Sequence, residues 1–201
     1  MNSEMSFEIR RKIVHSFSIL YIFIYFYVNK YFSHKTALLS LTLILILLLF
    51  IEFIKIKYQK KVPFFHPLYR ESEKNGLSGS IYLIIGTIIA FAAFDFEIAV
   101  TALLMLIFGD MASALIGISF GKHWLENIPQ KSWEGIIAEF IVDIAVGLIF
   151  LKYLPVVLVM AFTATLIETV LTSSDDNMAV PALAGFAGQS TLLFLRILGI
   201  I

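Results

Sequence analysis

The sequence predicts an all-α protein, a polytopic transmembrane bundle of about seven helices that forms one domain over residues 1–201. Of the 201 residues, 59% are hydrophobic, and the mean hydropathy is +0.89. A single soluble core of this length does not hide so much apolar surface, so lipid is the expected solvent. The formal net charge is +0, but the charged residues gather in a few loops.

Seven apolar runs predict the spans, for which a helix needs about 20 residues. They cover residues 16–28, 36–54, 77–94, 96–116, 135–151, 154–171 and 179–198. Pro181 falls near the start of the last run, where a missing N–H costs no hydrogen bond. Small residues at helical spacing predict close helix packing. Examples are Gly109 with Ser113, and Ala184 with Gly188.

The basic residues predict a cytoplasmic amino terminus. With seven spans, the amino terminus shares one side of the membrane with the second, fourth and sixth loops, and this side carries 11 of the 15 Lys and Arg residues. Cytoplasmic segments are enriched in Lys and Arg. The 11 are Arg10, Arg11, Lys12, Lys55, Lys57, Lys60, Lys61, Arg70, Lys74, Lys122 and Lys131.

Five acids lie inside or at the edge of the predicted spans: Glu52, Asp110, Glu139, Asp143 and Glu168. An ionised acid at the bilayer centre costs about 2.5–3.5 kcal/mol on insertion scales. In the predicted topology all five fall toward the cytoplasmic leaflet, and Glu139 and Asp143, four residues apart, share a helix face. A ring of carboxylates at an interface suits Mg²⁺ bound to a polyphosphate. The alternative is that these acids only orient the helices.

The stretch from Phe108 to Gly135, which covers the end of the fourth run and the loop after it, combines glycines with lysines. Its candidate nucleotide-binding residues are Gly109, Gly117, Gly121, Lys122 and Lys131. Glycines let backbone amides approach phosphate oxygens, and lysines supply positive charge. The loop is not a P-loop, because Ile116 and His123 stand where that motif needs Gly and a hydroxyl. A glycine-rich turn between helices remains the alternative.

Three further segments carry candidate residues. Asp175, Asp176 and Asn177 offer metal or substrate ligands, with a turn and helix cap as the alternative. Arg70 and Glu71 belong to a charged run that a solvated face would also explain, and His15 follows a basic stretch, Arg10 to Lys12, that headgroup anchoring would explain. No basic domain or aromatic stacking module indicates nucleic acid, and the absence of cysteine excludes thiol chemistry.

Five segments in order resemble the membrane lipid-alcohol kinases, the family of dolichol kinase, phytol kinase and CTP-dependent diacylglycerol kinase. They are RRKIVH (10–15), LYRESE (68–73), GDMASALIGISFGK (109–122), KSWEG (131–135) and ETVLTSSDDNMAVP (168–181). The resemblance implies transfer of the terminal phosphate of CTP to the hydroxyl of a membrane-dissolved alcohol. The chain lacks the late G-H-G-G…D-R-x-D signature of the related phosphatidate cytidylyltransferases, which favours phosphoryl over cytidylyl transfer.

Phosphoryl transfer depends on positioning and charge neutralisation. We expect Asp110 and one or both of Asp175 and Asp176 to hold Mg²⁺, and Lys131 to neutralise the transferred group. Ser132 and Asn177 are expected to bond phosphate or ribose.

Glu134 or Glu168 would orient or deprotonate the acceptor hydroxyl, and the sequence does not distinguish between these two candidates. The expected partners are a nucleotide triphosphate and a lipid alcohol, with an isoprenoid alcohol of the polyprenol or dolichol type favoured by the compact bundle. A homo-oligomer is compatible with the sequence. A CDP-lipid synthase and, less favoured, an ion-coupled transporter are the competing functions.

Overall fold

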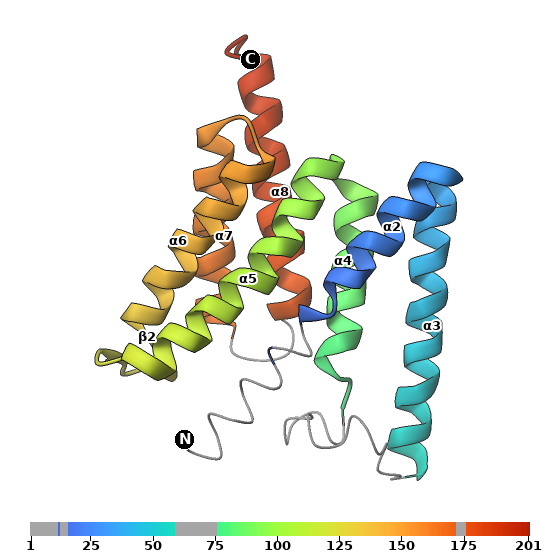
Figure 1. Cartoon of the computed structure of the whole chain (residues 1–201), viewed down its shortest axis with the longest axis horizontal. Helices are drawn as coiled ribbons and strands as arrows, with labels where there is room; N and C mark the ends of the chain where they lie inside the picture. The colour runs from blue at the N-terminus through green and yellow to red at the C-terminus, as the bar shows by residue number, and fades with distance from the viewer. Residues whose placement is uncertain (1–11, 13–15, 59–75, 172–175) are drawn as a thin grey trace.

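The computed structural model describes residue 12 and residues 16–58, 76–171 and 176–201. These residues form seven helices and one short hairpin (Figure 1). The elements are α2 (Ile19–Tyr31), α3 (His34–Tyr58), α4 (Gly79–Ala93), α5 (Phe96–Phe120), β1 (Trp124–Leu125), β2 (Ile128–Ser132), α6 (Trp133–Phe150), α7 (Leu154–Val170) and α8 (Asp176–Ile197). Each helix overlaps one predicted apolar run, so the all-α prediction is confirmed. Helices α3, α5 and α8 are long and apolar enough to cross a membrane.

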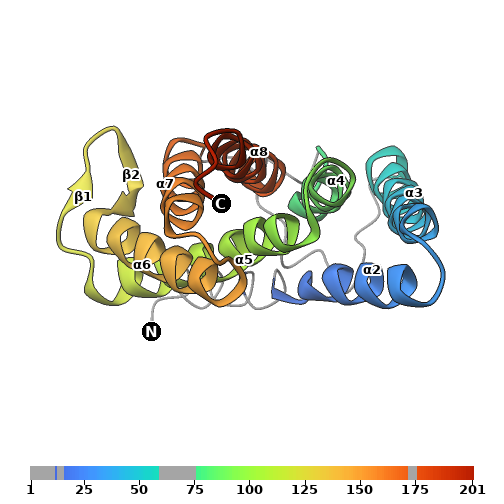
Figure 2. The same cartoon turned by 90° about the horizontal axis from the view of Figure 1, so that it is seen from above.

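Helix α5 is the centre of the bundle and packs against α4, α6, α7 and α8 (Figure 2). Its buried residues include Ile98, Leu103 and Met105. By contrast, α3 lies at the periphery, packed against α2 and α4, and most of its outward side chains are exposed. Apolar side chains on the outside of a bundle are expected where the solvent is lipid.

Helix α2 crosses the bundle obliquely (Figure 1). It has 13 residues. A helix of this size is about 20 Å long, shorter than the thickness of about 30 Å of a hydrocarbon core. Tyr25 fixes this helix, because its ring stacks on Phe91 of α4 with centroids 3.7 Å apart. The Tyr25 hydroxyl also bonds Nδ1 of His34 at 2.6 Å, which ties α2 to the start of α3.

The predicted small-residue contacts are present. A side chain at Gly188 would collide with Met160 of α7, and one at Gly109 would collide with Asp143 of α6. Glycines at these positions therefore let α7 and α8, and α5 and α6, approach closely.

Two features differ from the prediction. The loop between α5 and α6 contains the antiparallel pair β1–β2. These strands were not predicted, because they are short and polar and show no alternation of apolar and polar residues. Helix α8 begins at Asp176, so Pro181 lies inside the helix rather than at its start. Gly86 of α4 accommodates this, because a side chain there would lie 2.8 Å from Cγ of Pro181 and 2.9 Å from the carbonyl oxygen of Asn177.

The ends of α3, α5 and α7 and the starts of α4, α6 and α8 lie at one end of the bundle, and the carboxyl terminus lies at the other (Figure 1). The helix ends on either side of the second, fourth and sixth predicted loops thus share one end of the bundle, as seven spans require (Figure 1). It also holds the candidate site.

Candidate functional site

Four acids and two lysines meet near the loop end of the bundle, where α5, α6, α7, α8 and β2 converge. The acids come one from each helix, and Lys131 comes from β2. Each member interacts electrostatically with at least one other member. We call this group the charged cluster: Lys12, Asp110, Lys131, Glu139, Glu168 and Asp176.

Lys131 is bonded to Glu168 within the charged cluster. Its Nζ lies 3.0 Å from Oε1 of Glu168, and the two side chains are 15% and 5% exposed. Burial lowers the pKa of Lys131, but the nearby carboxylates of Glu168, Glu139 and Asp110 outweigh it, so the pKa is raised above the usual 10.5. Lys131 is therefore a fixed positive charge at the end of a strand.

Lys12 donates a hydrogen bond to Oδ1 of Asp110 in a partly buried ion pair. This contact joins the amino-terminal segment to the central helix α5. Asp110 is 7% exposed, late in α5, where the apolar run approaches its end. The sequence placed both residues on the same side of the membrane, but not in contact.

Several acid oxygens lack a hydrogen-bond partner among the residues that the structure describes. They are buried Oε2 of Glu168, Oε2 of Glu139 and Oδ1 of Asp143. A buried acceptor without a partner costs about 1–3 kcal/mol, so such atoms indicate a missing ligand or proton.

The charge of the cluster fits a bound divalent cation. Four carboxylates face two ammonium groups. If all six are ionised, two negative charges remain, which one Mg²⁺ would balance. Within the described ranges no three acids or histidines form a ready metal cage. Mg²⁺ commonly uses one or two carboxylates together with waters and phosphates, so the arrangement suits metal that arrives with a nucleotide.

Asp143 lies deeper in the bundle and connects three helices. It is 0% exposed on α6, and its Oδ2 accepts a hydrogen bond from the Thr165 hydroxyl of α7 at 3.1 Å. Its Oδ1 lies where a side chain at Gly109 of α5 would be. Glu139, one turn earlier, is also buried, so the prediction that these two acids share a face is confirmed.

The predicted glycines pack helices against each other around Ser132. The Ser132 hydroxyl caps α6 by accepting a hydrogen bond from the Gly135 amide at 3.2 Å. A side chain at Gly117 or Gly121 would lie 3.2 Å or 3.0 Å from this oxygen. The glycines of this turn thus allow close packing of the chain around Ser132. Contact of their amides or of Ser132 with phosphate stays a prediction.

Glu134 is paired on the hairpin rather than in the charged cluster. Its Oε1 lies 2.7 Å from Nδ1 of His123, and this bond is the main reason that the pKa of Glu134 is lowered to about 2. The backbone N–H of exposed Lys122 also bonds this carboxylate. Glu134 is consequently ionised and outward, a poor position for a proton acceptor at the cluster.

Asp176 and Asn177 form the buried start of α8. Oδ1 of Asp176 accepts a hydrogen bond from the Asn177 amide at 2.7 Å, and Nδ2 of Asn177 donates to the Gly79 carbonyl at 3.2 Å. A carboxylate at a helix start is stabilised by the helix dipole. The cap alternative therefore explains part of this segment, while the proximity of Asp176 to Glu168 links it to the cluster.

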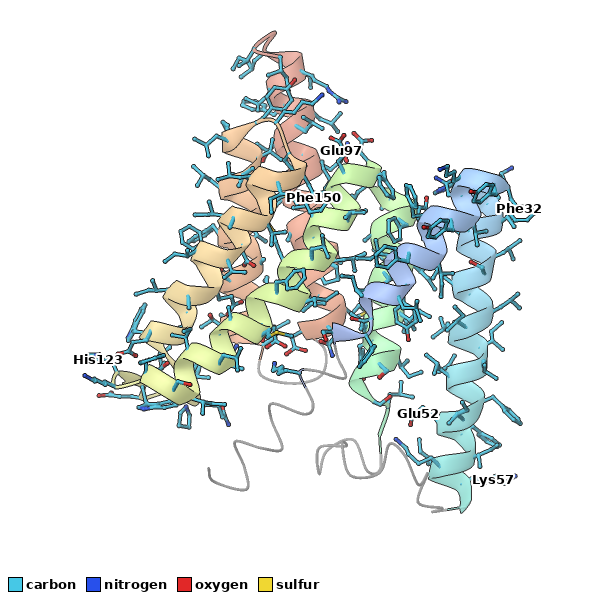
Figure 3. All side chains as sticks on the ribbon, viewed as in Figure 1. Phe32, Glu52, Lys57, Glu97, His123 and Phe150 are labelled. Atoms are coloured by element: carbon cyan, nitrogen blue, oxygen red, sulfur yellow. The ribbon has the colours of Figure 1, made fainter. Side chains whose placement is uncertain are left out.

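Other predicted residues do not join the site. Glu52 pairs with Lys55 on α3, and Lys55 Nζ donates to the Gly76 carbonyl at 3.1 Å. Figure 3 shows Glu52 on α3, which packs against α2 and α4, so Glu52 does not join the charged cluster. Residues outside the described part of the chain are Arg10, His15, Arg70, Glu71 and Asp175.

The sequence is similar to one protein family and to several known proteins. The sequence profile of the cytidylyltransferase family matches residues 6–175. CTP-dependent diacylglycerol kinase 1 of Saccharomyces cerevisiae is 30% identical over 154 residues, 73% of this chain and 51% of that protein. The Schizosaccharomyces pombe protein of the same name is 37% identical over 75 residues, 37% of this chain and 34% of that protein.

A third relative has similar length. The uncharacterized protein RP860 of Rickettsia prowazekii is 27% identical over 190 residues, 89% of this chain and 91% of that protein. The chain thus spans about half or less of the two yeast kinases that it matches. No solved structure is similar enough to count as a match.

Proposed function

The chain belongs to the cytidylyltransferase family, and we propose, from the names of its two yeast relatives, that it is a CTP-dependent lipid kinase of the membrane. It would transfer the terminal phosphate of CTP to the hydroxyl of a lipid alcohol. The observation that carries the proposal is the Lys131–Glu168 pair beside Asp110, a buried cationic group among acids where helices end. The names of the two yeast relatives support the same chemistry.

The reaction balances as an in-line displacement. The hydroxyl oxygen forms a bond to the terminal phosphorus, the bond between that phosphorus and the bridging oxygen breaks, and CDP leaves. The hydroxyl proton passes to a carboxylate. Such a transfer needs positioned charge more than covalent help from the protein.

Lys131 would neutralise the transferred phosphoryl group, since lysine binds phosphate as a point charge. Lys12 is a second cation within the same cluster and would bind an adjacent phosphate. Asp110 and Asp176 would hold Mg²⁺, with Asp175 as a further candidate. A metal ion bound there would neutralise negative charge on the phosphate oxygens.

For the proton acceptor, the geometry favours Glu168 over Glu134. Glu168 lies in the cluster, and its buried Oε2 has no hydrogen-bond partner in the part of the chain that the structure describes, whereas Glu134 is held by His123 on the hairpin. Glu139 also has a buried oxygen without a partner among the described residues, and it is the second candidate. A base must lie within hydrogen-bond reach of the proton it takes, and of these three glutamates only Glu168 and Glu139 belong to the cluster.

Diacylglycerol is the first acceptor to test, because the relatives' names support it. The isoprenoid alcohol expected from the sequence depends only on the compactness of the bundle and is the second. We place the site on the cytoplasmic face, where CTP is present, because 11 of 15 basic residues lie in segments on that side of the predicted topology.

The test uses purified protein, Mg²⁺, a panel of lipid alcohols together with phosphatidate, and CTP labelled on either the terminal or the innermost phosphate. Transfer of only the terminal label to lipid is the expected result. Transfer of the innermost label would instead identify a CDP-lipid synthase. Lys131→Ala should abolish transfer, while the matched lysine variant Lys152→Ala, on the opposite loops, should keep it.

A further inference from the structure

The hairpin between α5 and α6 exposes an aromatic surface. Trp124 and Trp133 are 47% and 56% exposed, and Phe120 at the end of α5 is 66% exposed. These are the two tryptophans of the whole chain. We call the segment from Phe120 to Trp133 the tryptophan hairpin.

The tryptophan hairpin is built as a fixed element. Trp124 pairs with Ser132 across the antiparallel strands. The Trp133 amide donates to the His123 carbonyl at 2.9 Å, and the Ser132 cap joins β2 to α6. The His123–Glu134 pair closes the same junction. Its aromatic side chains are therefore presented by paired strands and a capped helix.

The length of α5 places this hairpin at the membrane surface. The helix has 25 residues. A helix of this size is about 37 Å long, enough to cross a hydrocarbon core of about 30 Å even when tilted. Its end at Phe120 belongs to the loop end of the bundle (Figure 1), so we infer that this end lies among the headgroups. Exposed apolar side chains also occur on α5 and α6 close in sequence to the hairpin. These include Leu115, Ile137 and Ile141, which are 43%, 55% and 59% exposed.

We propose that the tryptophan hairpin lies in the headgroup region of the bilayer and fixes the depth of Lys131. Tryptophan concentrates at this level because its ring is apolar and its N–H is polar. Lys131 lies on β2, two residues before Trp133, so the hairpin and the cation move together. The second half of the proposal rests on the proposed function, since the headgroup level is where a lipid alcohol presents its hydroxyl.

The occupant of this surface is lipid in general rather than anionic lipid. Lys122 and Lys131 are balanced within the hairpin and its junction by Glu126 and Glu134. Lys131 is moreover already paired with Glu168. Insertion should therefore be the same in zwitterionic and anionic bilayers, in contrast to basic amphipathic segments.

Intrinsic fluorescence tests the depth without any assay of turnover. Trp124→Phe and Trp133→Phe each leave one reporter, and each protein is reconstituted in phosphatidylcholine brominated near the headgroup or near the chain end. We expect stronger quenching by the shallow bromines, weak quenching by aqueous acrylamide, and no change when phosphatidylglycerol is added. Full acrylamide quenching without bromolipid quenching, or strongest quenching by the deep bromines, would overturn the proposal.

The proposal that the tryptophan hairpin fixes the depth of Lys131 is tested separately, by the KM for the lipid acceptor. Replacing both tryptophans by alanine should raise KM for the lipid acceptor about tenfold and leave KM for CTP unchanged. Phe162→Ala, which removes a 61% exposed aromatic from the middle of α7, is the matched control and should change neither value. Equal effects of both variants would overturn the positional role. If no variant or wild-type protein transfers phosphate, the kinase proposal fails while the fluorescence result still decides the membrane contact.

Discussion

The ammonium group of Lys12 is bonded to the carboxylate of Asp110, a residue 98 positions later on the central helix. The contact ties Lys12 to the acids of the helix bundle. The effect of mutating such a partly buried pair depends on whether the pair only stabilises the fold or also binds a nucleotide. Removal of either partner leaves an uncompensated charge, whereas removal of both does not.

Substitutions of Lys12 and Asp110 separate these roles. Lys12→Met and Asp110→Asn should each reduce kcat/KM for CTP at least about tenfold, because each removes a proposed phosphate or metal contact. Asp110→Asn should also raise the Mg²⁺ concentration that gives half-maximal activity. The measurement is a Mg²⁺ titration of each purified variant.

The double variant is the control. If the pair only holds the fold, Lys12→Met with Asp110→Asn should recover both thermal stability and activity. If the residues bind substrate, stability recovers while activity stays low. An unchanged Mg²⁺ titration in Asp110→Asn would remove this residue from the metal site.

The raised pKa of Lys131 predicts an extended alkaline range. A pKa above 10.5 keeps the side chain charged throughout the neutral and moderately alkaline range. Its ion pair with Glu168 therefore contributes fully below the unfolded pKa and is lost only as pH rises through the folded value. Activity should show no loss attributable to Lys131 between pH 7 and about 9.5, well below its folded pKa. Glu168→Gln removes a favourable charge and should bring the loss of the Lys131 charge to lower pH, which the pH dependence of CTP binding in the presence of Mg²⁺ would show.

The sequence was sufficient for the helices but not for all of the site. Apolar runs located seven helices because lipid imposes a minimum span length. Intramembrane charge is costly, so Asp110, Glu139 and Glu168 already indicated function before any contact was known. The sequence alone does not predict that these three acids lie close to Lys131, because packing around α5 brings their helices together.

Sequence reasoning missed two features for identifiable reasons: that Glu52 stays outside the site, and that a hairpin precedes α6. Glu52 has the same residue type and depth as the cluster acids, but its helix lies at the edge of the bundle, where Lys55 one turn away neutralises it. The β1–β2 hairpin has only two residues in its first strand, too few for a period to be detected. The turn signal was Glu126–Asn127, which is weak because Asn also occurs in ordinary loops.

Gly109 should be intolerant of any side chain. A methyl group there would overlap Oδ1 of Asp143. Overpacking of this kind costs about 1–3 kcal/mol. Gly109→Ala should therefore lower thermal stability in detergent, and adding Asp143→Ala should restore part of it by making room. Failure of the second substitution to relieve the first would show that the contact with Asp143 is not the cause.

The Glu52–Lys55 pair should matter for stability and not for turnover. Both side chains are buried. Removing one partner of a buried pair typically costs about 3–5 kcal/mol. Glu52→Gln should lower the unfolding temperature, and Glu52→Gln with Lys55→Met should recover it. Neither variant should alter KM for CTP or the Mg²⁺ titration; a change in either constant would bring α3 into the active site.

Mg²⁺ and nucleotide should bind together, because the lysines of the cluster are already neutralised by acids. For Lys131 to contact a phosphate, its bond to Glu168 must weaken, and the released carboxylate then lies near two other acids, Asp110 and Asp176. A divalent cation offsets that repulsion, so each ligand favours the other. We expect CTP to bind at least about tenfold more tightly with Mg²⁺ than with a chelator, a coupling of about 1.4 kcal/mol. By linkage, CTP must strengthen Mg²⁺ binding by the same factor. Calorimetric titration of Glu168→Gln should show a smaller factor, because no carboxylate is released, and an undiminished factor would show that the exchange of ion pairs is not its source.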